Sequence, residues 1–281
     1  MYGRKTWRKY MIIFLVSSIV LIAGYCFWQN NALSVSVIPF ASAKVHEGLN
    51  GYKIVHISDL HNKSFGKMQG RLTAKLRKIK PDLIVLTGDL VDSRRTDLLP
   101  AEIFAKEAAK IAPVYYVTGN HEHRLPKRVF EELLSRLSSS GVHILKNCGN
   151  KIEVFNGEGF YLLGIFDENL LDETLSDLSR EVLLPGSFSI LLAHQPQYID
   201  KYAKEEIDLV FAGHAHGGQW RLPGFGGFFA PKQGFFPKYT KGLYWFGKTA
   251  LVVSGGLGNS LCPIRIHNRP EIVVVELQKK N

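Results

Sequence analysis

The sequence predicts an α/β domain that follows an N-terminal transmembrane helix. Three observations support this arrangement. From residue 52 onward, short apolar runs of strand length alternate with helix-type patterns. Several of these runs are followed within a few residues by a carboxylate, an amide or an imidazole. Near the N-terminus, residues 11–28 form an apolar stretch without a charged side chain, and basic residues precede it.

Length, charge and cysteine content set the broad class of the protein. The chain has 281 residues, enough for one large α/β domain or two small ones. Its net charge of +10 suits an anionic surface or substrate, such as phospholipid headgroups, nucleic acid or phosphorylated small molecules. The three cysteines, Cys26, Cys148 and Cys262, form no disulfide framework and no metal-binding pair of the C-x-x-C type.

The N-terminal segment is predicted to be a retained membrane anchor. Residues 11–28 would span about 27 Å as a helix, close to the hydrocarbon thickness of a bilayer. Basic residues before this stretch keep the N-terminus in the cytoplasm by the positive-inside rule, so the remaining chain lies on the outer or periplasmic face. The alternative is a cleaved signal peptide, but the only small-x-small site, at residues 41–43, lies far downstream. Residues 1–30 are therefore assigned to a basic tail and signal anchor.

The first half of the chain reads as strands that alternate with helices. Residues 31–50 are predicted to be a linker or an edge strand, with a strand-like run at Leu33–Ile38, and the main domain is assigned to residues 51–281. His56, inside the first strand of that domain, is interpreted as a packed core residue. The strands expected here are Tyr52–Ser58, Asp82–Leu86 and Val114–Val117, and the helices are Met68–Ile79, Pro100–Lys110 and Pro126–Leu137.

From residue 142 the pattern changes from alternating strands and helices to consecutive short strands. Three short strands separated by glycine and asparagine, at Val142–Lys146, Lys151–Phe155 and Phe160–Phe166, predict a meander instead of crossovers. A helix at Leu171–Leu183 and a strand at Ser187–Ala193 follow, and a helix through Ala203 leads to the strand Leu209–Ala212. The last expected strands are Leu243–Phe246, Ala250–Ser254 and Ile272–Leu277.

Five of the predicted strands end in residues of metal-ligand type. The residues are Asp59 and His61, Asp89, Asn120 and His121, His194, and the pair His214 and His216. In α/β sheets, sites form beyond the carboxyl ends of strands, so these side chains are expected to meet. In an extended chain both imidazoles of the His-x-His pair would reach one point, and imidazole binds Zn, Fe, Ni or Mn. Each residue alone also fits a turn, a helix cap or an exposed loop, but the set favours a metal site.

The motifs that contain these residues resemble those of the calcineurin-like metallophosphoesterases. They are D-x-H at Asp59–His61, G-D at Gly88–Asp89, G-N-H-E at Gly119–Glu122, the single His194 and G-H-x-H at Gly213–His216. The resemblance covers residues 52 to about 277 and implies a four-layer α/β/β/α sandwich. The tail motifs, among them Gly255–Gly258, look like those of the membrane-associated YkuE/YaeI branch. Some relatives of that branch act as UDP-2,3-diacylglucosamine pyrophosphatases.

The resemblance implies a dinuclear metal site. It assigns Asp59, His61 and His216 to one metal ion and Asn120, His194 and His214 to the other, with Asp89 between them. A bridging carboxylate holds two cations about 3.5–4 Å apart, the spacing of two-metal phosphoester sites. The mixed nitrogen and oxygen donors fit Mn, Zn or Fe, and the absence of thiolates argues against a closed structural zinc site. The implied reaction is in-line attack of a metal-bridging hydroxide on phosphorus.

His121 is the residue expected to stabilise the transition state and to protonate the leaving oxygen. The alternative is a histidine that only orients Asp59. Asp92 and Glu122 are expected to support the ligands. Aromatic and basic residues after the last motif are expected to form an aromatic lip beside the metals. The alternative is an ordinary loop folded onto the domain. The residues are Phe225, Phe228, Phe229, Phe235 and Phe236 together with Lys232 and Lys238.

The sequence thus predicts a membrane-anchored phosphodiesterase or pyrophosphatase with two divalent metal ions, and a lipid-linked or nucleotide-sugar-lipid phosphoester is one candidate substrate. A phosphomonoesterase of the protein-phosphatase kind and a metal-binding scaffold without turnover are the alternatives. Nucleases share these motifs, but the anchor places the domain away from nucleic acid, so no nucleic-acid partner is expected.

Overall fold

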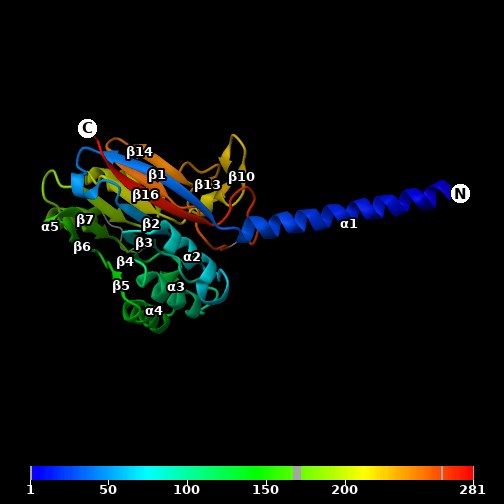
Figure 1. The fold of residues 1–281 in the computed structure, drawn as a ribbon, viewed down its shortest axis with the longest axis horizontal. Coiled ribbons are helices and arrows are strands. Elements are labelled where there is room, and N and C mark those ends of the chain that lie inside the picture. Colours follow the sequence, from blue (N-terminus) through cyan, green and yellow to red (C-terminus); the bar gives the residue numbers. More distant parts are fainter. Residues whose placement is uncertain (1, 167–171, 261, 281) are drawn as a thin grey trace.

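Two six-stranded sheets packed face to face form the body of the molecule, and one long helix projects from it (Figure 1). The computed structural model describes the backbone of residues 2–166, 172–260 and 262–280. The side chains between the sheets make one apolar layer, which includes Val85, Phe160 and Phe211. Helices cover the outer face of each sheet, so the predicted four-layer α/β/β/α arrangement is confirmed.

The first sheet has the strand order β1-β16-β2-β3-β4-β5 and is mixed. Strands β2 to β5 run parallel to one another, and β16 is antiparallel to β2 and parallel to β1. The run predicted at residues 33–38 therefore belongs to an edge strand. The bounds are β1 (Ser34–Ser42), β16 (Glu271–Lys279), β2 (Lys53–Ile57), β3 (Leu83–Thr87), β4 (Val114–Val117) and β5 (Val142–Ile144).

The second sheet has the order β14-β15-β9-β8-β7-β6. Its central strands β15, β9, β8 and β7 are parallel, and each edge strand pairs antiparallel with its neighbour. The bounds are β14 (Gly242–Phe246), β15 (Thr249–Val253), β9 (Leu209–Ala212), β8 (Ser189–Leu192), β7 (Glu158–Gly164) and β6 (Cys148–Phe155).

The meander predicted for residues 142–166 is wrong in its first strand. Strand β5 joins the first sheet, parallel to β4 and after a helical crossover, whereas β6 and β7 form a hairpin in the second sheet. The turn residues between β5 and β6 mark the passage from one sheet to the other. Asn147 lies there with a φ of 49°, and its side-chain oxygen accepts a hydrogen bond from the Phe166 amide.

The helices form the two outer layers. Leu72, Phe104 and Leu133 pack the first helical layer onto the first sheet, and Leu175 and Tyr202 pack the second layer onto the second sheet. The first layer contains α2 (Gly70–Ile79), α3 (Leu99–Ala109) and α4 (Lys127–Ser139), and the second contains α5 (Asp172–Val182) and α6 (Ile199–Lys204). Leu171, the predicted start of α5, lies outside the described residues. Short 3₁₀ turns are η1 (Glu47–Leu49), η2 (Lys67–Gln69), η3 (Glu122–Arg124), η5 (Pro196–Tyr198) and η6 (His216–Gly218).

Two small hairpins project at the end of the body from which the long helix leaves (Figure 1). We call residues 220–236 the hairpin lobe. One hairpin pairs β10 (Arg221–Leu222) with β11 (Gly226–Gly227), and the other pairs β12 (Phe229–Ala230) with β13 (Gly234–Phe235). The lobe contains all but Lys238 of the residues expected to form the aromatic lip.

The projecting helix α1 (Tyr2–Asn31) is long and apolar enough to cross a membrane. Its segment Trp7–Asn31 has a mean hydropathy of 2.3, and none of the window that defines it is buried against the body. The fold itself therefore leaves most of these apolar side chains exposed.

Candidate functional site

The five strand ends singled out in the sequence converge between the two sheets. Strands β2, β3 and β4 bring residues from the first sheet, and β8 and β9 bring residues from the second. The side chains are almost completely buried, with relative exposures of 8% or less. They are Asp59, His61, Asp89, Asn120, His121, His194, His214 and His216.

One group contains Asp59, His61, Asp89 and His216, with one potential ligand atom from each within 4.8 Å of the others. The Nε2 atoms of His61 and His216 are 3.2 Å apart. His61 Nε2 lies 3.6 Å from Asp89 Oδ2, and His216 Nε2 lies 3.5 Å from Asp59 Oδ1. We call these four residues the first metal group.

A second group contains Asp89, His194 and His214. His214 Nδ1 lies 3.2 Å from His194 Nε2, which lies 3.3 Å from Asp89 Oδ2. Asp89 is thus common to both groups. The carboxamide oxygen of Asn120 in the same site is buried and has no hydrogen-bond partner in the described part of the chain. We call these residues, with Asn120, the second metal group.

This donor set fits divalent cations. The buried side-chain oxygen of Asn120 has no hydrogen-bond partner among the described residues. Leaving a buried polar atom without a partner destabilises the fold by about 1–3 kcal/mol. Burial lowers the pKa of His61 to about 4 and that of His214 to about 3, so both imidazoles are neutral. Burial opposes ionisation of Asp89, but the neighbouring His194 and His61 hold its pKa well below the usual value. Neutral imidazoles and ionised carboxylates are the forms that bind metal.

The backbone at the candidate ligands is unusual. Asp59, His61, Asp89, His214 and His216 all have φ between 45° and 67°, in the left-handed region that few residues other than glycine adopt. Residues in this conformation persist where surrounding structure enforces it, and they concentrate at functional sites. The expectation that an extended His-x-His pair aims both imidazoles at one point is wrong. The chain turns between the two residues, so His214 joins the second metal group and His216 joins the first.

Two glycines let the strand ends approach closely. A Cβ atom on Gly213 would lie 1.8 Å from Ser58 Oγ, and one on Gly119 would lie 2.4 Å from Asp89 Oδ1. The space that these glycines leave open allows the His214 amide to donate to both carboxylate oxygens of Asp59 at 3.1 Å. The absence of a side chain at Gly119 also lets the loop of Asn120 lie directly beside Asp89.

Buried polar contacts fix the second metal group. His194 Nδ1 donates to the carbonyl oxygen of Thr87 at 2.6 Å, which directs its Nε2 toward the ligand cluster. The Glu122 carboxylate accepts from the amides of Asp89 and Gly119 at 2.8 Å and from that of Val91 at 3.1 Å. Burial raises the pKa of Glu122 to about 8, and these amide donors oppose that rise. Glu122 therefore ties the loop of Asp89 to the loop of Asn120.

A different segment supports the first metal group. We call residues 255–260 and 262–268 the support loop. Its Gly258 amide donates to the Asp59 carbonyl oxygen at 2.6 Å, and Asn268 Nδ2 donates to the His216 carbonyl oxygen at 2.7 Å. The guanidinium of Arg265 is fully buried and donates to carbonyl oxygens of this loop, and burial lowers its pKa to about 10.

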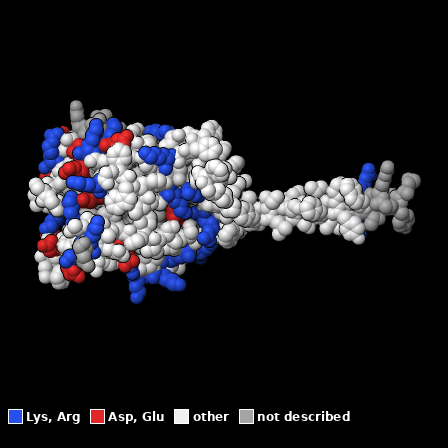
Figure 2. Space-filling view, turned by 90° about the horizontal axis from the view of Figure 1, so that it is seen from above, with Lys and Arg blue, Asp and Glu red and all other residues white. Residues whose placement is uncertain are grey.

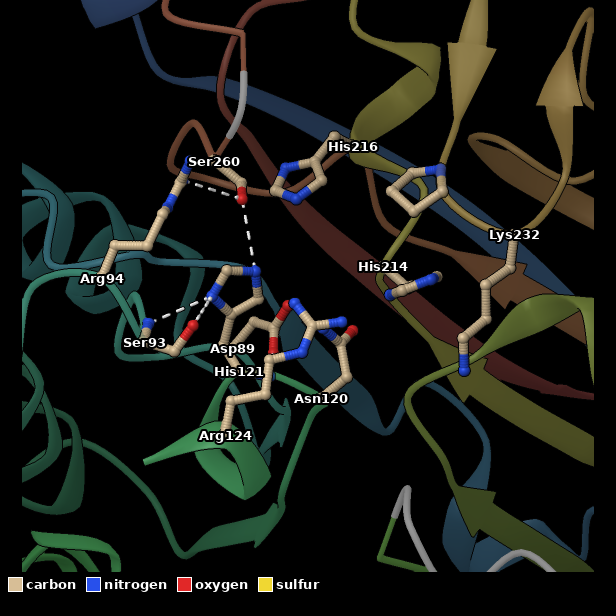
Figure 3. A pocket seen from close by; sticks show the side chains of 11 residues that line it. Asp89, Ser93, Arg94, Asn120, His121, Arg124, His214, His216, Lys232 and Ser260 are labelled. Atoms are coloured by element: carbon tan, nitrogen blue, oxygen red, sulfur yellow. Dashed lines mark hydrogen bonds between the residues drawn. The ribbon is translucent and has the colours of Figure 1, made fainter. Parts of the chain in front are cut away.

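His121 lies at the mouth of the cluster, between two serines (Figure 3). Its amide donates to Asp89 Oδ1 at 2.8 Å. Its ring Nδ1 lies 3.1 Å from the amide and the hydroxyl of Ser93, and its Nε2 lies 3.2 Å from Ser260 Oγ. Burial lowers the pKa of this histidine. Among the described residues, its hydrogen bonds do not involve Asp59.

A pocket of about 370 Å³ opens above the cluster. Of its described lining residues, Asp89 is the one carboxylate, whereas three are cations. Arg94 forms a two-point contact with Asp92 at 3.0 and 2.8 Å, and Lys232 lies across the pocket from it (Figure 3). The lining residues are Asp89, Ser93, Arg94, Asn120, His121, Arg124, His214, His216, Pro231, Lys232 and Ser260.

Sequence reasoning missed Ser93, Arg94, Arg124 and Ser260. The first three follow the motif residues Asp89 and Asn120 by only a few positions, which is a signal that could have singled them out. Ser260 follows a glycine-rich segment far along the chain and reaches the pocket only through the fold.

Comparisons with known proteins agree with this geometry. A family model described as calcineurin-like phosphoesterase matches residues 52–218. The uncharacterized metallophosphoesterase YkuE of Bacillus subtilis is 31% identical, with 85% of this chain and 84% of the relative covered. The phosphodiesterase YaeI of Escherichia coli is also 31% identical, over 80% of this chain and 82% of the relative. A 5'-nucleotidase precursor from Thermus thermophilus has the same fold, with a TM-score of 0.50 at 15% identity, over 74% of this chain and 49% of that structure.

Proposed function

The chain belongs to the calcineurin-like phosphoesterase family, and from this we propose that it hydrolyses phosphodiester or pyrophosphate bonds with two divalent metal ions at a membrane surface. The observation that carries the proposal is the position of Asp89. This carboxylate belongs to both metal groups, and it lies at the floor of the pocket. A carboxylate shared by two groups of ligands is what a two-metal phosphoester site requires.

We assign the ligands by group. Asp59, His61 and His216 would hold one cation, Asn120, His194 and His214 the other, and Asp89 both. The bound cations would supply Lewis acidity toward the phosphoryl oxygens and lower the pKa of a water molecule toward neutrality. We leave the metal open among Mn, Zn and Fe because the nitrogen and oxygen donors suit all three.

We assign proton transfer to His121. Its Nε2 faces Ser260 at the pocket wall, and its Nδ1 faces Ser93, so the ring is held in one orientation beside the ligand cluster. A histidine in this position can give a proton to the leaving oxygen. The Arg94, Arg124 and Lys232 cations around the pocket would attract and orient the anionic substrate.

The printed name of the relative YaeI, a phosphodiesterase, supports a diester substrate. The test compares bis-p-nitrophenyl phosphate with p-nitrophenyl phosphate, using the full chain in detergent. We expect faster cleavage of the diester, loss of activity with a chelator, and recovery with Mn²⁺, Zn²⁺ or Fe²⁺. Faster cleavage of the monoester would favour a phosphomonoesterase, and metal binding without hydrolysis of either compound would favour a scaffold.

We further propose that α1 is a retained anchor with the catalytic domain on the outer or periplasmic face. Cleavage after residue 43 would remove the whole of strand β1, which pairs with β16 along its length. Residues 51–281, completed by this strand, would form the catalytic domain. The mass of the mature chain tests this proposal. An intact N-terminus supports the anchor, and a chain that begins after residue 43 would contradict it.

A lipid-linked phosphoester is the substrate class that we propose from the anchor, since it is concentrated at the same surface. Activity of the full chain toward phosphoesters embedded in vesicles tests the lipid-linked substrate separately from diester hydrolysis. Accumulation of such a lipid in a deletion strain would support it, and an unchanged lipid composition would argue against it.

A further inference from the structure

The hairpin lobe exposes an aromatic surface to solvent. Phe225 is 78% exposed, Phe235 66% and Phe236 61%, and Trp220 and Leu222 next to them are also exposed. Trp220, Phe235 and Phe236 belong to one cluster, because the ring of Phe228 lies 6.1 Å from that of Trp220, 5.3 Å from that of Phe235 and 5.7 Å from that of Phe236. Leu222 and Phe225 lie in the adjoining β10–β11 hairpin, where the Phe225 amide donates to the Leu222 carbonyl oxygen. Grouped exposed aromatics of this kind mark a surface with a partner.

Backbone hydrogen bonds and close packing fix the lobe to the rest of the fold. The Phe228 amide donates to the carbonyl oxygens of Gly218 and Trp220, and the Phe236 amide donates to that of Phe228. A Cβ on Gly218 would lie 2.3 Å from the Cα of Gly227, so the lobe packs directly on the turn that carries His216. The aromatic surface is therefore held at a fixed place beside the metal site.

The support loop connects the lobe to the root of α1. Trp220 Nε1 donates to the Ile264 carbonyl oxygen at 3.0 Å, and the Arg221 amide donates to that of Ile266 at 2.9 Å. The residues that follow contact the helix. His267 Nδ1 lies 3.2 Å from the Tyr25 hydroxyl, and the Asn268 amide donates to Gln29 Oε1 at 3.2 Å.

No flexible linker separates α1 from the body. The helix ends at Asn31, and β1 begins at Ser34. Arg71 and Lys63 donate to the carbonyl oxygens of Asn31 and Asn30 at the end of the helix. The body is therefore fixed to the membrane end of the helix, and elements that project beside that end must lie close to the lipid headgroups.

The charge around the root of α1 suits such a surface. Lys and Arg side chains gather where the helix leaves the body (Figure 2). Lys63 and Arg71 contact its last carbonyl groups, and the Arg269 guanidinium lies 5.0 Å from the ring centroid of Trp28. Tryptophan and basic side chains are the residues that favour the interface of a bilayer with anionic lipids.

From these contacts we infer that the hairpin lobe is a second membrane contact, with Phe225, Phe235 and Phe236 inserted at the headgroup level of the leaflet from which α1 emerges. The inference rests on the proposed anchor. Pro231 and Lys232 of the lobe line the pocket on one side, and Ser260 of the support loop lines it on another. The contact therefore turns the pocket toward the bilayer surface.

The test uses the full chain with Cys26, Cys148 and Cys262 replaced by serine. Single cysteines at Phe225 or Phe235 carry an environment-sensitive nitrobenzoxadiazole dye, and the chain is reconstituted into vesicles of phosphatidylcholine and phosphatidylglycerol with nitroxide-labelled lipids. Leu21→Cys reports on the anchor. Phe155→Cys is the matched control, because Phe155 is an aromatic residue that is 61% exposed in strand β6.

We expect the dyes at 225 and 235 to lose most of their emission to nitroxides near the headgroups, as the dye at 21 does to nitroxides on the acyl chains, while the dye at 155 keeps its emission. Emission at 225 and 235 that matches 155, with quenching at 21, would overturn the inference and leave the anchor intact. Unquenched emission at 21 would overturn the anchor and the inference with it.

Cleavage of bis-p-nitrophenyl phosphate by each labelled variant shows that the fold is retained, since neither Phe225 nor Phe235 lines the pocket. A variant that has lost this activity is replaced by one labelled at Leu222, which is 45% exposed in the same lobe. The same quenching pattern is expected there, and its absence would count against the inference in the same way.

Discussion

The two metal groups share Asp89 but differ in what supports them. The second group is fixed from within the sandwich, where His194 donates to Thr87 of a central strand and Glu122 ties together the loops after β3 and β4. The first group depends on the support loop, since Asn268 holds the His216 carbonyl group and Gln29 of α1 accepts from the Asn268 amide. The first group is therefore linked through Asn268 to α1, whereas the contacts that fix the second group come from within the sandwich.

The largest effect is expected where the two groups meet. Asp89→Asn should remove measurable turnover and lower the content of both metals, because one carboxylate serves both groups. Hydrolysis of bis-p-nitrophenyl phosphate and elemental analysis measure the two outcomes. Asp177→Asn, at an exposed carboxylate on α5, is the control. Full metal content with a near-normal rate in Asp89→Asn would refute the shared ligand.

The next effect concerns the proton donor. His121→Ala should keep both metals and slow hydrolysis by roughly 10²–10⁴-fold, the usual contribution of a positioned acid. The loss should be smaller for substrates with good leaving groups such as p-nitrophenol, which need little protonation. His143→Ala, at an exposed histidine on β5, is the control. Equal losses for good and poor leaving groups would remove the proton-transfer role from His121.

The difference in support between the two metal groups is tested by Asn268→Ala and Gln29→Ala. Asn268→Ala should weaken binding of the metal in the first group by about 10- to 100-fold, the usual effect of removing a group that orients a ligand. Gln29→Ala, which removes only the acceptor of the Asn268 amide, should weaken it less, and the metal in the second group should stay bound in both variants. Titration of the metal-free full chain measures the two affinities. Gln278→Ala, at an exposed glutamine on β16, is the control. An equal loss of both metals would show that the two groups do not differ in support.

The smallest effect is expected at the rim of the pocket. Arg124→Ala and Lys232→Ala should each raise the KM of an anionic diester by up to about fivefold with little change in kcat, because exposed ion pairs contribute only ~0.2–1 kcal/mol. Steady-state kinetics at low and high salt measure this, and the effect should shrink at high salt. Lys248→Ala, at an exposed lysine between β14 and β15, is the control. A change confined to kcat would contradict the proposed role.

The sequence predicted the parts of the site that depend on local pattern. Apolar runs that stop before Asp59, Asp89 and Asn120 are visible without a structure, because a buried strand must end where polar ligands begin. The short apolar runs also placed most strands, and they are apolar throughout because both faces are covered: Ile54 and Val85 face one core layer, and Val55 and Ile84 face the other.

The parts that depend on contacts through space were not predictable. The left-handed backbone at His214 and His216 accompanies close packing of the neighbouring glycines against Ser58 and Asn268. Local pattern predicted an extended His-x-His pair instead, and only the family resemblance assigned the two imidazoles to different groups. Strand β5 pairs with β4 of the first sheet. A short apolar run followed by turn residues does not indicate which of the two sheets the strand will join. The support loop is distant in sequence from every ligand that it holds.

The central claim is that two divalent cations lie on either side of Asp89. Crystals of the full chain grown with Mn²⁺, measured near the manganese absorption edge, test it most directly. We expect two anomalous peaks, one among Asp59, His61 and His216 and the other among Asn120, His194 and His214. A single peak, or peaks away from Asp89 in a fully loaded and active sample, would contradict it.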